Sequence, residues 1–112
     1  MLLEKESWRQ KRKDMRVQIK EIQIVPIKPI NGLVGFASFV LDKLFYFGSI
    51  GIYTRPNGGY RLTYPTKKVG NNSVGIFYPI NKQIAEDIED VIISEFEKVT
   101  KMYDRHNQIN TR

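Results

Sequence analysis

Residues 78–99 of the 112-residue chain have the sequence YPINKQIAEDIEDVIISEFEKV, which predicts the long amphipathic helix of the fold. Most apolar side chains here recur at spacings of three and four residues and therefore share one helix face. They are Ile84, Ile88, Val91, Ile92, Phe96, Val99 and Tyr103. Asn81 is a favoured N-cap, because its side-chain oxygen can accept a hydrogen bond from the first turn. We expect the apolar face of this helix to pack on a sheet.

The residues before the helix predict strands. Residues 17–25 have a period-two pattern that predicts a strand with two partly apolar faces, and Pro26 and Pro29 indicate that its far end is a sheet edge or leaves the sheet. Asn31-Gly32 is a strong signal for a two-residue hairpin turn. The further strands that the pattern predicts are residues 33–41, 44–54, 60–64 and 76–78. A loop is expected between the last two of these, over residues 66–75.

The predicted fold class is therefore α+β, with an antiparallel β-sheet of four to five strands packed by one C-terminal amphipathic helix. We divide the chain into a basic N-terminal extension (residues 1–16), the α+β domain (residues 17–103) and a frayed tail (residues 104–112). At this length one small domain is the expectation.

The third predicted strand begins with Leu44-Phe45-Tyr46-Phe47, in which apolar side chains do not alternate with polar ones. Such a run indicates apolar cover on both faces of the strand. One long helix can cover only one face of the sheet. A second subunit is the simplest way to cover the other face of this strand. We therefore expect a homodimer.

The net charge of +6 is unevenly distributed. Residues 82–101 carry six acidic and three basic side chains, out of 12 and 18 in the chain. Acidic residues occupy the first turns of the predicted helix, and Lys98, Lys101 and Arg105 its last turns, as the helix dipole favours. A basic body beside an acidic helix favours a polyanionic partner, although many small basic domains bind no anion.

Several classes of site have little support. The chain has no cysteine, and its single histidine, His106, lies in the polar tail, so we expect neither a metal site nor a histidine-dependent enzyme. The acids Glu86, Asp87, Glu89 and Asp90 have the spacing of a solvated helix face, and the glycines match no nucleotide-binding motif. We expect no cofactor, no small-molecule substrate and no membrane span, and a cytoplasmic location.

Three stretches of the chain resemble the stage V sporulation protein G (SpoVG) family of septation regulators. VQIKEIQIVPI (residues 17–27) stands where the family has its first strand, and YPTKK (residues 64–68) where it has a proline, a small hydroxyl residue and two basic residues. The most specific match is YPINKQIAEDIEDVIISEFEKV, where the family has a histidine, Pro-Ile-Asn and a helix of the same acidic and aliphatic rhythm. The resemblance covers about residues 17–103.

The resemblance implies a small bacterial dimer that binds nucleic acid, either DNA or RNA, and regulates septation and sporulation. The two basic residues of the family motif correspond to Lys67 and Lys68 in this chain. From the sequence itself, Arg61 lies near the lysine pair and can add a further phosphate contact. Arg55, which precedes Pro56 in a turn, is either another phosphate contact or an exposed turn residue.

A second hypothesis is a protein-interaction adaptor on the same fold that does not bind nucleic acid. Tyr78 stands where the family commonly has histidine, and Ser73-Val74-Gly75 replaces a stretch that usually includes arginine. These two departures favour the adaptor.

Overall fold

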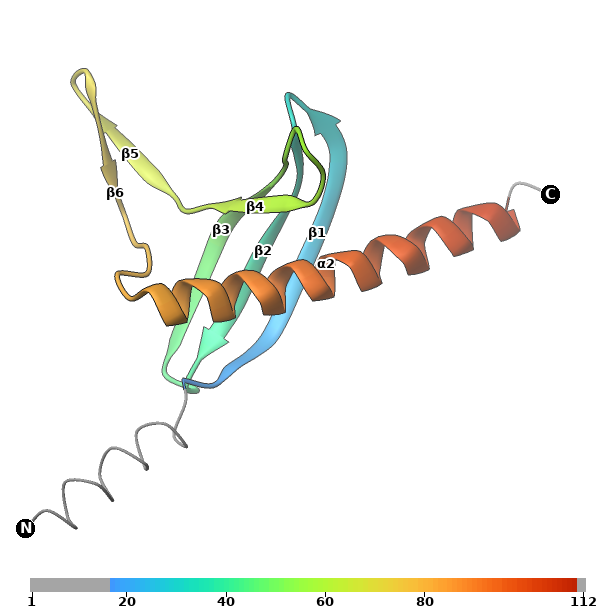
Figure 1. Ribbon diagram of the computed structural model, residues 1–112, viewed down its shortest axis with the longest axis horizontal. Coiled ribbons are helices and arrows are strands. Elements are labelled where there is room, and N and C mark those ends of the chain that lie inside the picture. Colours follow the sequence, from blue (N-terminus) through green and yellow to red (C-terminus); the bar gives the residue numbers. More distant parts are fainter. Residues whose placement is uncertain (1–16, 111–112) are drawn as a thin grey trace, which may run out of the picture.

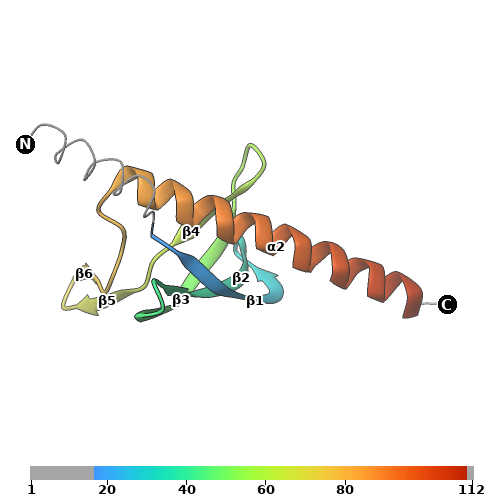
Figure 2. The ribbon, with the colours of Figure 1, turned by 90° about the horizontal axis from the view of Figure 1, so that it is seen from below.

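The computed structural model describes the backbone of residues 17–110 and the side chains of residues 17–102. The predicted basic extension, residues 1–16, lies outside the described residues. The elements in chain order are β1 (Ile19–Ile30), β2 (Leu33–Leu41), β3 (Phe45–Thr54), β4 (Tyr60–Thr63), β5 (Thr66–Val69), β6 (Asn72–Gly75) and α2 (Lys82–Asn110). Figures 1 and 2 show two layers, with α2 lying across one face of the sheet.

The main sheet is an antiparallel meander in the order β1-β2-β3-β4, so the predicted α+β fold class is confirmed. The turn between β1 and β2 is Asn31-Gly32, with φ angles of 51° and 88°. Two successive positive φ angles are what a type I′ turn requires, and the predicted hairpin is confirmed. Asp42 and Lys43, with φ angles of 52° and 60°, make the corresponding turn between β2 and β3.

The core lies between the sheet and α2. Its fully buried apolar side chains come from the two central strands and the helix, and they are Ala37, Phe39, Ile50, Ile52, Ile88, Ile92 and Phe96. The helix members recur every four residues, which is the stripe that the sequence predicts. The Oδ1 atom of Asn81 accepts a hydrogen bond from the Ile84 amide at 3.0 Å, which confirms Asn81 as the N-cap.

Bulges in two strands decide which side chains reach this core. The β1–β2 register slips between Lys20 and Gln23, where Glu21 has a φ of 50°. The β2–β3 register slips between Ala37 and Phe39, opposite Ser49, which has a φ of 60°. An extra residue in one strand reverses the alternation beyond it. Ile19 and Ile22 therefore both pack against the core, although a regular strand would turn them to opposite faces.

The strand β1 is longer than predicted. It continues through both prolines to Ile30, because it is an edge strand and Pro26 can lie there without breaking an interior ladder. The helix is longer as well and ends at Asn110, so residues 104–110 of the expected frayed tail are helical. The first turn of the helix holds no acidic residue and the last turn no basic residue, so the charges that the helix dipole favours are not at its ends.

Two predictions near residue 70 are wrong. Residues 66–75, expected as a loop, form the two-stranded hairpin β5–β6. Residues 76–78, expected as a strand, are not one. The hydrogen bonds between β5 and β6 end with one from the Ile76 amide to the Pro65 carbonyl at 2.9 Å. Pro65 has no N–H group that could extend the pairing.

Candidate functional site

The two predicted site lysines lie on the hairpin β5–β6, which extends away from the main sheet in Figure 1. Every residue of both its strands is exposed. The turn at its tip begins with Gly70, whose φ of 63° fits a hairpin turn with glycine at the first central position. Lys67 and Lys68 are therefore carried by a narrow arm that is open on both sides.

The lysines point to opposite faces of this arm, because successive side chains of a strand alternate. Lys67 lies opposite Val74 and Lys68 opposite Ser73. The face with Lys67 also carries Val69, whereas the face with Lys68 is polar. The pair is therefore two separate charges that flank the arm, and each can approach a different phosphate.

Arg61 lies on β4, the edge strand that leads into the hairpin. Its guanidinium carbon is 4.8 Å from the centre of the Tyr53 ring, which belongs to the residue paired with it on β3. This is a cation–π contact, and it holds the guanidinium against the sheet face opposite the helix. No local pattern predicts this contact, because Tyr53 and Arg61 meet only through the register of β3 and β4.

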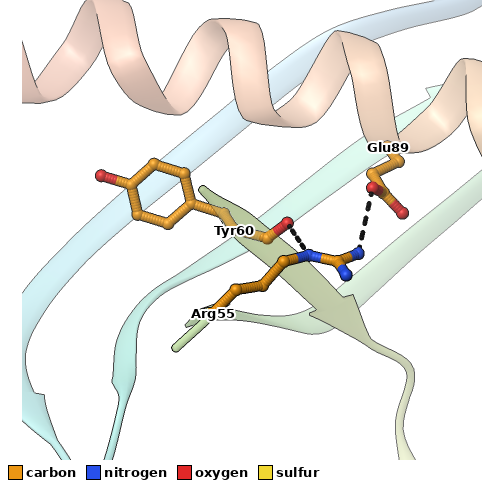
Figure 3. Close-up of polar contacts among 3 residues, drawn as sticks. All are labelled: Arg55, Tyr60 and Glu89. Atoms are coloured by element: carbon orange, nitrogen blue, oxygen red, sulfur yellow. Dashed lines mark hydrogen bonds and ion pairs between the residues drawn. The ribbon is translucent and has the colours of Figure 1, made fainter. Parts of the chain in front are cut away.

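Arg55 is held by two partners (Figure 3). Its Nε atom donates a hydrogen bond to the Tyr60 carbonyl at 2.9 Å, and its guanidinium lies 3.6 Å from the Glu89 carboxylate of α2. Arg55 thus joins the β3–β4 turn to the helix, and a phosphate would have to compete with Glu89 for it. Arg55 directly follows β3 and contacts the first residue of β4, whereas the lysines come after the end of β4.

The four predicted residues are therefore spread along one extended segment. From Arg61 to Lys67 the chain advances six residues, which is on the order of 20 Å in extended conformation. No acidic residue occurs anywhere from residue 43 to residue 85. Every charged side chain of this segment is therefore basic, and the acids of α2 lie on the adjoining element.

The same segment carries exposed apolar side chains. Val69 and Val74 lie on the hairpin, and Ile76, Tyr78 and Ile80 on the connection from the hairpin to α2. Clusters of this kind on a small domain mark surfaces that contact other molecules.

An apolar groove adjoins this cluster, and it has no counterpart among the sequence predictions. Its volume is about 270 Å³, and it lies between β2, β3 and the first turns of α2. Phe39, Leu41, Phe47, Tyr64, Phe77 and Ile84 are among its lining side chains. Burial, together with the nearby Glu89 carboxylate, raises the pKa of Tyr64 to about 12.

Over residues 17–102, no three His, Asp or Glu side chains gather closely enough to hold a metal ion. Within the described part of the chain, no helix is long and apolar enough to cross a membrane. A comparison with protein-family models gave no match, and no curated protein matches the chain significantly. The SpoVG resemblance and the roles that it implies remain predictions.

Proposed function

We propose that this protein is a small, dimeric, cytoplasmic regulator that binds nucleic acid, with phosphate contacts made by Lys67 and Lys68. Arg61 adds a third contact on the neighbouring strand, and Arg55 contributes where it is released from Glu89. The resemblance to the SpoVG family extends the proposal to the regulation of septation or sporulation.

The observation that carries the proposal is the exposed hairpin. Lys67 and Lys68 stand on a narrow arm, within a segment of more than 40 residues that has no acidic side chain. Each lysine that neutralises a phosphate releases condensed counterions, which favours binding without any base contact. Tyr53, already stacked with Arg61, belongs to the type of side chain on which unpaired bases stack.

The test is a salt series of binding to labelled duplex DNA and to single-stranded RNA. A dimer that neutralises about four phosphates through its lysines should give a slope of log affinity against log salt of roughly −3.6 on duplex DNA. Lys67→Gln/Lys68→Gln should bind more weakly and lose most of this slope. The matched control is Lys20→Gln/Lys28→Gln, which removes the same charge from exposed positions on the opposite edge strand and should bind as the unmodified protein does.

Equal loss of affinity in the two double variants would show that only net charge matters. Binding that neither variant changes would assign the contact to another surface. Circular dichroism on each variant would establish that its fold is retained.

A second candidate function is the protein-interaction adaptor. The exposed apolar cluster of Val69, Val74, Ile76, Tyr78 and Ile80 favours it. An adaptor should bind neither nucleic acid even at low salt, and its affinity for an uncharged partner surface should vary little with salt.

A further inference from the structure

The helix α2 covers one face of the main sheet (Figure 2), and the opposite face carries two aromatic rings. A Cβ atom at Gly35 would lie 3.1 Å from the Cε1 atom of Phe96 on the helix, so Gly35 faces α2. Phe36 is the next residue of β2 and therefore faces away from the helix, and it is 40% exposed. Tyr53 in the same way follows Ile52, which is fully buried in the core. Phe36 and Tyr53 thus share the face that the helix leaves open.

The sheet between these rings is flat. Gly51 pairs with Phe36 on β2 and with Thr63 on β4. A Cβ atom at Gly51 would lie 2.6 Å from the Thr63 Oγ1 atom and 3.2 Å from the Tyr53 Cε2 atom, so both side chains lean over the glycine. At the position beside Phe36, the strand β3 therefore has no side chain of its own, and a planar group can lie against the Phe36 ring.

Arg61 extends this surface onto β4. Its guanidinium carbon lies 4.8 Å from the centre of the Tyr53 ring, and the residue is nevertheless exposed. Phe36 and Tyr53 are diagonal neighbours on adjacent strands, a separation of roughly 7 to 8 Å. Unpaired bases stack on aromatic rings and on guanidinium planes. Phe36, Tyr53 and Arg61 together form a stacking surface with room for adjacent planar groups.

The charges on this surface suit a polyanion. The strands β2, β3 and β4 contain no acidic residue, and β4 leads directly into the hairpin that carries Lys67 and Lys68. The run of residues 44–47, from which we expect the dimer, lies toward the other end of β3. Tyr46 and Tyr53 are seven residues apart in that strand, on the order of 20 Å. A dimer formed through this run leaves the stacking surface open.

We propose that the stacking surface binds single-stranded nucleic acid, with one unpaired base on Phe36 and another on the Arg61–Tyr53 pair. This inference rests on the proposed function and specifies its substrate as an unpaired strand. In a duplex, neighbouring base pairs cover both faces of each base and only the base edges are open in the grooves, so a duplex cannot use the stacking surface. The hairpin lysines contact the phosphates of either form.

The test compares two labelled probes, oligothymidylate and the same strand annealed to oligoadenylate, with the full chain. Phe36→Ala should bind oligothymidylate at least about fivefold more weakly, because one stacked base loses its ring. Its affinity for the duplex should not change. The slope of log affinity against log salt should also stay the same for both probes, since no phosphate contact is removed.

Two further variants separate stacking from charge and from general loss of apolar surface. Arg61→Lys keeps the positive charge and removes the guanidinium plane, so it should weaken binding of the single strand alone. The matched control is Ile30→Ala, which removes an apolar side chain, 61% exposed, at the end of β1 and should leave both affinities unchanged. Phe36→Leu removes only the ring, and it replaces Phe36→Ala if circular dichroism shows that the alanine variant does not fold.

Unchanged single-strand binding in the Phe36 and Arg61 variants would overturn the stacking surface, while binding that still depends on Lys67 and Lys68 would preserve the proposed function. Equal weakening for both probes would also overturn it. If the unmodified protein binds neither probe at low salt, the proposed function fails and the stacking surface fails with it. Conversion of a dimer to a monomer by Phe36→Ala, measured by light scattering, would assign this face to a second copy of the chain.

Discussion

Tyr64 makes a pH-dependent contribution to stability that can be measured. Burial and Glu89 raise its pKa to about 12, from the 10.0 of an unperturbed tyrosine. Between these values the unfolded chain loses the phenolic proton while the folded chain keeps it, so the unfolded state binds fewer protons. The contribution is fully present below pH 10 and is lost as the pH rises toward 12.

We therefore expect the free energy of unfolding to fall above pH 10, by at most about 1.4 kcal/mol per pH unit from this one group. Urea denaturation at several pH values between 9 and about 12 measures this. Tyr64→Phe isolates the contribution, since it removes the titrating group and keeps the ring. Identical pH profiles for the two proteins would contradict the assignment to Tyr64.

At the scale of elements, the Arg55–Glu89 pair joins the β3–β4 turn to α2. Both side chains are partly exposed, at 49% and 41%, so the pair contributes little to stability. Its larger effect is on charge, because it occupies the guanidinium that a phosphate would otherwise contact. In the proposed complex, the helix would compete with nucleic acid for one of the four proposed site residues.

Glu89→Gln should release Arg55 at a cost in stability of less than about 1 kcal/mol. In the DNA salt series we expect tighter binding and a slope steeper by up to about 0.9 per chain. Glu86→Gln removes the same charge from an exposed position one turn earlier on α2. If the two variants gain affinity equally, general charge reduction is the cause and Arg55 has no special part.

At the scale of the whole molecule, the run that suggested a second subunit is open to solvent in the single chain. Leu44, Phe45 and Tyr46 are 77%, 59% and 69% exposed. Of these four residues, only Phe47 turns inward. The centroid of its ring lies 5.5 Å from the centroid of the Phe39 ring. Exposed apolar side chains at three successive positions are the surface that the proposed homodimer would cover.

Light scattering coupled to size-exclusion chromatography should give the mass of a dimer for the intact protein. Leu44→Lys/Tyr46→Lys should give a monomer, because each lysine would be desolvated in the interface. Met102→Lys changes an equally exposed apolar residue outside this run and should leave the dimer intact. A monomer for the intact protein at all concentrations would contradict the dimer.

Some site features could be read from the sequence and others could not. The basic pair at Lys67 and Lys68 was found because it is contiguous. Its placement on a hairpin was missed, because β5 and β6 bury no side chain and so lack the period-two signal of a half-buried strand. The partners of Arg61 and Arg55 were missed because each is brought close by strand register or helix packing.

Features that depend on neighbours within a few residues can be read from the sequence. The helix follows from the apolar spacing after Asn81, and the Asn31-Gly32 turn from backbone preferences of those two residues, which together lead to the α+β class. The tertiary structure alone decided the bulges at Glu21 and Ser49, the attachment of Arg55 to Glu89, and the groove around Tyr64. These depend on contacts between residues far apart in the chain, for which local periodicity carries no information.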